Sequence, residues 1–145
     1  MRRIASEKGN ALLEAAVTIP LLLLISVGIF DFGRAYQTWQ ILTNAAREGA
    51  RVAVVPNPVA GGPEARVRDY MRGGELTRAE TATITVDRNA TLTVNGQTVS
   101  ASRVTIEYPF DFIALQPVAR LVNPSSQAGQ PVTMRASVLM RNEAQ

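Results

Sequence analysis

Two residue types that carry much of protein chemistry are absent, because the 145 residues include no cysteine and no histidine. Without cysteine the chain has no disulfide framework and no thiolate metal site. Without histidine it lacks the commonest general acid or base and the commonest metal ligand. Glu107 and Asp111 are close in sequence but are interpreted as solvated acids where a strand ends. Glycines 61–62 and 73–74 are interpreted as turn and cap residues rather than as a phosphate-binding loop. The sequence therefore predicts no enzyme activity, no metal site and no cofactor.

A clustered patch of positive charge is also lacking. The formal net charge is +3, and the first eight residues, MRRIASEK, contribute +2 of it. The remaining arginines are scattered among acids, which is not the pattern of a nucleic-acid-binding surface. Arg66, Arg68 and Arg72 are interpreted as a solvated helix face, with acidic lipid headgroups or a protein partner as the alternative. No nucleic-acid partner is expected.

A long apolar run dominates what is present. Between Ala15 and Phe30 there is no charged residue. A bilayer core of ~30 Å needs about 20 residues of helix, so residues 10–30 have the required length if Glu14 is included. The basic residues before the run favour a cytoplasmic amino terminus. These features predict one helix across the inner (cytoplasmic) membrane, with the rest of the chain outside the cytoplasm. A cleaved secretory signal, with a weak cleavage site at residues 31–35, is the alternative.

Glu14 is the residue of this run that requires an explanation. An acid near the end of a membrane helix costs up to about 3 kcal/mol on insertion scales. One interpretation is an interfacial acid in a signal anchor. In the other, a peptidase cleaves after Gly9, so that Asn10 becomes the amino terminus and Glu14 the fifth residue. The new amine and the carboxylate then lie one helical turn apart. Pairing within one chain, or between neighbouring helices, offsets the burial of both charges.

The stretch that begins at Gly9 resembles the amino-terminal signature of TadE-like pseudopilins, which are minor pilin-like proteins of tight-adherence (Flp-type) pili. The similar features are Gly9, Glu14, Pro20 and the sequences at 44–51, 104–110 and 140–143. The resemblance implies that a prepilin peptidase removes residues 1–9 by cutting between Gly9 and Asn10, and that Glu14 acts in assembly. Pro20 interrupts helix hydrogen bonding, and the resulting kink is either without consequence or part of assembly.

The function that the resemblance implies is that of a minor pseudopilin that helps to start or cap a tight-adherence, type IV-like pilus. Its expected partners are a prepilin peptidase, other pilins or pseudopilins of the same pilus, the inner-membrane assembly platform and membrane lipid. The main alternative is a signal-anchored extracytoplasmic binding domain that is not incorporated into a filament. A major filament subunit is disfavoured, because Flp-type major pilins are little more than the helix and here more than 90 residues follow Val52.

The helical pattern continues beyond the apolar run. Apolar and aromatic residues recur at intervals of three and four, which predicts an amphipathic helix to about Val52. The residues predicted to pack this helix against the domain are Phe32, Tyr36, Trp39 and Leu42. For Tyr36 and Trp39 the alternative is an aromatic belt at the membrane interface.

Beyond this helix the sequence predicts a small domain. A second helix is expected at 64–72, and alternating apolar and polar residues predict strands at 83–86, 91–94, 104–108 and 132–141. Asn95–Gly96 predicts a hairpin turn, and 110–122 an apolar connection, part helical and broken by Pro117. The predicted fold is α+β and pilin-like, with a long transmembrane and amphipathic helix packed on a small antiparallel sheet. The predicted segments are a leader (1–9), a transmembrane segment (10–30) and an extracytoplasmic domain (31–145).

Overall fold

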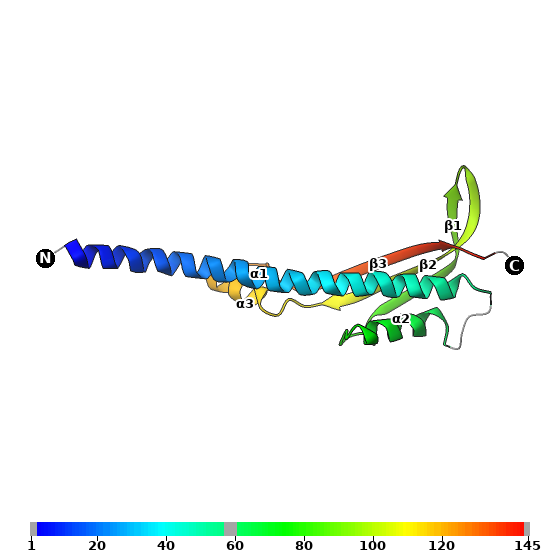
Figure 1. Ribbon diagram of the computed structural model, residues 1–145, viewed down its shortest axis with the longest axis horizontal. Helices are drawn as coiled ribbons and strands as arrows, with labels where there is room; N and C mark the ends of the chain where they lie inside the picture. Colours follow the sequence, from blue (N-terminus) through cyan, green and yellow to red (C-terminus); the bar gives the residue numbers. More distant parts are fainter. Residues whose placement is uncertain (1–2, 57–60, 144–145) are drawn as a thin grey trace. The chain divides into compact units, whose positions relative to one another are not determined.

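The structure is a computed structural model and describes residues 3–56 and 61–143. In chain order the elements are α1 (Arg3–Ala53), α2 (Gly62–Gly73), β1 (Thr83–Val94), β2 (Gln97–Phe110), α3 (Leu115–Val122) and β3 (Val132–Arg141) (Figure 1). The three strands form one antiparallel sheet in the order β1-β2-β3. The predicted α+β fold, a long amino-terminal helix packed on an antiparallel sheet, is confirmed.

The chain forms two compact units, and α1 runs through both. The first, called the helical unit, contains α1 up to Arg34 and the segment Asp111–Pro131, which includes α3. The second, called the sheet unit, contains Ala35–Phe110 and the chain from Val132 onward. The apolar run of α1 and the core of the sheet therefore belong to different units.

α1 confirms the predicted amino-terminal helix and extends it. The sequence predicts a helix from Asn10 to about Val52, and α1 covers that range in full. It also includes residues before Gly9, where no glycine or proline is present to stop a helix. Pro20 lies inside α1, and the helix continues on both sides of it.

The core of the sheet unit forms where small residues of α1 approach α2 and β2. The buried residues of α1 in this unit include Leu42, Ala45, Ala46, Gly49, Ala50 and Ala53. A Cβ atom at Gly49 would lie 3.4 Å from Cγ1 of Val104 in β2, and closer still to Val67 in α2. Val67 and Val104 are themselves fully buried. Glycine is needed at position 49 because three elements meet there with no room for a side chain.

β1 joins two segments that the sequence pattern predicts as separate strands, 83–86 and 91–94. The register with β2 shifts between Asp87 and Ala90, and the backbone N–H of Asn89 donates to the Asp87 carboxylate at 3.0 Å. This β-bulge interrupts the alternation of apolar and polar residues without ending the strand. The two predicted strands are therefore one strand with a bulge.

The hairpin turn at Asn95–Gly96 is confirmed. The φ angles of these two residues are 51° and 77°, as a type I′ turn requires, and Val94 pairs with Gln97 across it. Glycine adopts such a positive φ without steric cost. The tight turn sets the register in which β2 follows β1.

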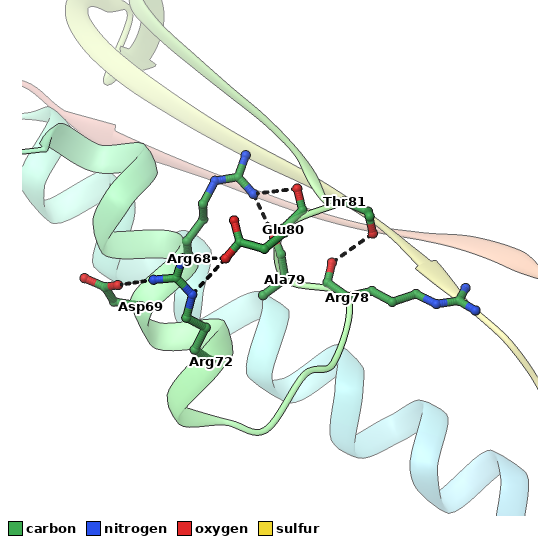
Figure 2. Close-up of polar contacts among 7 residues, drawn as sticks. All are labelled: Arg68, Asp69, Arg72, Arg78, Ala79, Glu80 and Thr81. Carbon is green, nitrogen blue, oxygen red and sulfur yellow. Dashed lines mark hydrogen bonds and ion pairs between the residues drawn. The ribbon is translucent and has the colours of Figure 1, made fainter.

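Arginine side chains hold α2 to the chain that leads into β1. The Arg68 guanidinium donates to the carbonyls of Ala79 at 2.7 Å and Glu80 at 3.1 Å, as Figure 2 shows. Arg72 pairs with the carboxylates of Asp69 and Glu80 (Figure 2). Arg72 is exposed, whereas Arg68 is half-buried. The predicted solvated face is thus confirmed for Arg72, and Arg68 has a structural role instead.

The prediction that Pro117 breaks the apolar connection is wrong. α3 begins at Leu115 and continues through Pro117 to Val122. Pro117 is the third residue of α3, and the N–H groups of a helix's first turn have no acceptor within the helix. Proline therefore removes no hydrogen bond at this position. An irregular loop then leads to Pro131.

Candidate functional site

The amino-terminal part of α1 exposes most of its large apolar side chains. Their exposed fractions range from 44% at Leu23 to 73% at Leu12. Within the described residues, α1 contains the one helical stretch that is long and apolar enough to cross a membrane, near the amino terminus. An apolar helix whose side chains have so few partners in its own chain fits a single-pass membrane anchor.

The residues predicted for processing and assembly are exposed on this part of α1. Gly9, Asn10 and Glu14 are all exposed. Glycine inside a helix costs about 0.5–1 kcal/mol relative to alanine. A Cβ atom at Gly9 would meet no atom within 4 Å, so packing within the described structure does not explain the glycine. Glu14 lies among exposed apolar neighbours such as Leu13 and Val17.

Pro20 and Ser26 interrupt the apolar pattern further along the run. Pro20 has no N–H, so the carbonyl of Ala16 loses its usual helical donor. The Ser26 hydroxyl donates to the Leu22 carbonyl at 2.8 Å, which satisfies this polar side chain within the helix. A lipid tail offers no donor to the Ala16 carbonyl, so a neighbouring group or a local adjustment of the helix must supply one in a bilayer.

The four residues predicted to pack α1 against the domain differ in their surroundings. Leu42 is fully buried. Phe32 is 62% exposed, and its ring meets that of Phe112 edge to face, with the centroids 5.8 Å apart. Tyr36 and Trp39 are 63% and 47% exposed and lie beside each other. Tyr36 and Trp39 therefore lie outside the core. The residues of α1 that are buried in the core have mostly smaller side chains.

Asp31 is a fully buried carboxylate to which the sequence patterns assign no role. It accepts hydrogen bonds from the backbone N–H groups of Ile113 at 3.3 Å, Ala114 at 2.9 Å and Leu115 at 2.7 Å. The Arg34 guanidinium lies 3.2 Å from the same carboxylate. These N–H groups belong to the first residue of α3 and the two residues before it, so Asp31 caps a helix that begins more than 80 residues later in the sequence. This arrangement is called the Asp31 cap.

The electrostatics of the Asp31 cap favour the ionised carboxylate. Burial by itself raises the pKa of Asp31, because desolvation penalises the charge. Hydrogen bonds from the N–H groups of Ala114, Leu115 and Ile113 and from Arg34 act in the opposite direction, and the pKa of Asp31 lies below its ordinary value of 3.8. The side chain is therefore charged at neutral pH. A single acid directly after a long apolar run is the sequence signal that would have pointed to this site.

Among residues 3–56 and 61–143, no group of three or more His, Cys, Asp or Glu side chains is placed to hold a metal ion. Glu107 lies within β2 and faces Arg135 of β3 at 3.9 Å, with both side chains exposed to solvent. Glu107 therefore takes part in an exposed ion pair on the sheet.

The protein belongs to the structural class in which an apolar, exposed amino-terminal helix continues into a small α+β domain. The family model described as TadE-like protein matches residues 9–51. This segment includes Gly9, Glu14, Pro20 and the stretch 44–51, so the predicted resemblance to TadE-like proteins is confirmed over it. The matched residues lie within α1, and the match does not extend to the strands of the sheet unit. No curated protein and no solved structure matches the chain.

Proposed function

We propose that this protein is a minor pseudopilin that helps to start or cap a tight-adherence, type IV-like pilus. α1 anchors it in the cytoplasmic membrane with a cytoplasmic amino terminus, and the sheet unit lies outside the cytoplasm. The observation that carries the proposal is the exposed apolar run of α1 within the segment matched by TadE-like proteins. Apolar side chains exposed in such a continuous run need lipid or other apolar helices around them.

Processing comes first in this proposal. A prepilin peptidase cuts between Gly9 and Asn10 and removes the leader. The exposure of both residues, and the lack of any packing contact that would require glycine at position 9, support this assignment. The apolar run remains on the mature protein, so cleavage leaves the membrane anchor intact.

Glu14 then neutralises a terminal amine. The carboxylate of Glu14 pairs with the new amine of Asn10, in the same chain or in a neighbouring subunit. Glu14 lies on a helix surrounded by apolar side chains, so lateral association of such helices would otherwise bury an unpaired charge. A paired amine and carboxylate offset each other's burial. Assembly therefore depends on the charge of Glu14.

The partners in this proposal are the prepilin peptidase, other pilins or pseudopilins of the same pilus, the inner-membrane assembly platform and membrane lipid. The exposed pair Tyr36 and Trp39 suits such surroundings, because aromatic residues with one polar end favour membrane interfaces and protein interfaces. Pro20, which leaves one carbonyl without its helical donor, lies where neighbouring helices pack.

Coexpression with the prepilin peptidase of the same pilus system tests the processing step. The intact mass of the mature protein should correspond to a chain that begins at Asn10. Gly9→Val should block cleavage, because it places a branched side chain at the cleaved bond. Gly33→Val is the matched control, since Gly33 also has no atom within 4 Å of its Cβ position, and it should be processed normally. A mature protein that begins at Met1, or after Ala35, would contradict the pseudopilin function.

Substitution of Glu14 separates a pseudopilin from a signal-anchored binding domain that enters no filament. Glu14→Ala should leave cleavage intact and should favour insertion, because removal of the acid lowers the transfer cost. Copurification with pilus partners and surface piliation should fail with Glu14→Ala and Glu14→Gln, since breaking a buried charge pair costs about 3–5 kcal/mol. Glu14→Asp should keep part of the activity. Thr18→Ala, a control on the same exposed run, should keep all of it. Full piliation with Glu14→Ala would favour the signal anchor instead.

A further inference from the structure

α3 lies along α1 and covers one stripe of its apolar run. Phe112 meets Phe32, and Cδ1 of Leu115 lies 3.9 Å from the Cβ position of Gly28. These two contacts show that α3 runs back toward the amino terminus of α1, as Figure 1 shows for α3 (orange) and α1 (blue). From position 20 on, the half-buried residues of the apolar run are Pro20, Leu24, Val27 and Gly28. Their spacing is that of one helix face, which leads to the buried Asp31.

Helix geometry places this stripe relative to a bilayer. At ~1.5 Å per residue, residues 10–30 of α1 span about 30 Å, the thickness of the hydrocarbon core. Asp31 then lies at the extracytoplasmic boundary of that core. α3 has eight residues and starts at the level of Asp31, so it would extend about 12 Å into the hydrocarbon.

The polar groups of α3 and of the loop after it do not suit that depth. Arg120 on α3 is exposed, and so are Asn123 and Gln127 in the loop 123–131. A charged side chain is unfavourable in hydrocarbon, and irregular backbone exposed to lipid does not occur there. Docking of α3 on α1 and full insertion of residues 10–30 in a bilayer therefore exclude each other.

We propose that α3 acts as a clasp on α1. α3 docks on α1 when residues 20–31 of α1 are outside the hydrocarbon core, and it leaves α1 when these residues are inside the core. In the bilayer, lipid covers Leu24 and Val27. Outside the bilayer, α3 covers them instead. The inference rests on the proposed function, because it requires that α1 is a membrane anchor and is drawn out of the membrane during assembly.

The Asp31 cap gives the docked state its specificity. Three backbone N–H groups, from the two residues before α3 and from its first residue, converge with the Arg34 guanidinium on one buried carboxylate. Asp31 lies at the end of the apolar run, where it contacts water while α1 is inserted.

A subunit at the start or end of a filament has fewer neighbouring helices than one in the middle. α3 supplies such a subunit with cover for one face of α1.

Crosslinking between introduced cysteines tests the clasp, because the natural chain has none. In the full chain, Gly28→Cys with Leu115→Cys should be joined by a short bifunctional thiol reagent only when α3 is docked. Thr105→Cys with Ser137→Cys is the control pair, because these residues face each other across β2 and β3 with their hydroxyls 2.9 Å apart. The control pair should be joined in every state.

Membrane insertion is measured separately in the same vesicles. A fluorophore on Val17→Cys should be quenched by lipids that carry a doxyl group on the acyl chain, since Val17 is exposed on the apolar run. In vesicles of phosphatidylcholine and phosphatidylglycerol in equal parts, the crosslinked Gly28→Cys/Leu115→Cys product should be at least about tenfold less abundant than in the pilus fraction sheared from cells. In that fraction Asp31→Asn should reduce the product and leave the control pair unchanged.

The outcomes distinguish the clasp from the proposed function. Equal crosslinking of the Gly28→Cys/Leu115→Cys pair in vesicles, with the Val17→Cys probe quenched, would overturn the clasp and leave the membrane anchor standing. No crosslinking of that pair in the sheared fraction, with the control pair joined, would also overturn the clasp alone. An unquenched Val17→Cys probe would overturn the membrane anchor, and with it both proposals.

Discussion

The two ends of α1 carry apolar residues in opposite situations. In residues 10–30 the large side chains Leu, Ile and Val are mostly exposed. From Leu42 to Ala53 the buried positions hold mainly alanine and glycine, and α2 and β2 approach them closely. Apolar residues are mostly buried within the chain at the second end and mostly exposed at the first.

This comparison distinguishes residues that stabilise the folded domain from residues whose exposure suits a membrane anchor. Glycine is needed at position 49 because side chains of Val67 and Val104 lie against it, and Ala46 in the same stretch is fully buried. Large side chains at Leu12 and Val17 are 73% and 69% exposed, which fits a helix that anchors the protein in a membrane. Substitutions at the two ends should therefore affect different measurements.

The largest difference is expected between two glycines of α1. Gly49→Leu should destabilise the sheet unit by about 3 kcal/mol, because the new side chain overlaps Val67 and Val104. Gly33→Leu should cause no loss, since no atom lies within 4 Å of its Cβ position and leucine favours a helix. Urea unfolding of the full chain in detergent micelles, followed by circular dichroism, measures both. Equal effects of the two substitutions would remove the distinction between the two ends.

The next effect concerns the Asp31 cap, through which the helical unit holds α3. Asp31→Ala should weaken docking of α3 by about 2 kcal/mol, because three N–H groups lose their acceptor. Hydrogen exchange at the amides of 113–115 should become roughly 30-fold faster, under conditions in which the Gly28→Cys/Leu115→Cys pair crosslinks. Arg34→Gln should have a smaller effect, since the Arg34 side chain is partly exposed. Unchanged exchange in Asp31→Ala would show that the cap does not hold α3.

The Asp31 cap should also respond to acid. Because the pKa of Asp31 is lower in the folded chain than its ordinary value of 3.8, its contribution to stability is complete above that value. The contribution is lost as the pH falls through the folded pKa. In an NMR titration, the amide resonances of Ala114 and Leu115 should move with a midpoint below 3.8. Asp31→Asn should abolish that titration, and a midpoint above the ordinary value would contradict the cap.

The smallest effects are expected at the arginines of α2. Arg68→Ala should destabilise the sheet unit by about 1 kcal/mol, because the Ala79 and Glu80 carbonyls lose a charged donor. Arg72→Ala should leave the unfolding midpoint unchanged, since its ion pairs are exposed to solvent. Urea unfolding of both variants measures the difference. A larger loss with Arg72→Ala would show that the exposed pairs, rather than Arg68, hold α2.

Several features of the structure follow from local sequence alone. The apolar run, the continuous helix to Val52 and the turn at Asn95–Gly96 are encoded in hydrophobic periodicity and in the φ preference of single residues. The signature at Gly9 and Glu14, together with Pro20, is also local, and it lies within the segment that the TadE-like family matches.

Other features depend on which segments meet in three dimensions. The bulge at Asp87 makes one strand of two predicted ones, because pairing with β2 continues across it. Pro117 is tolerated because α3 starts two residues before it, a boundary that the Asp31 cap helps to set. Tyr36 and Trp39 match the helical period as well as Leu42 does, yet only Leu42 is buried.

The sequence by itself determined that α1 would form and that its first part would be apolar, because helix formation and hydropathy are properties of neighbouring residues. Only the tertiary structure decided which face of α1 is covered and what Asp31 does. The N–H groups that donate hydrogen bonds to Asp31 belong to residues more than 80 positions away. No local pattern specifies such a contact, because it forms only when α3 lies along α1.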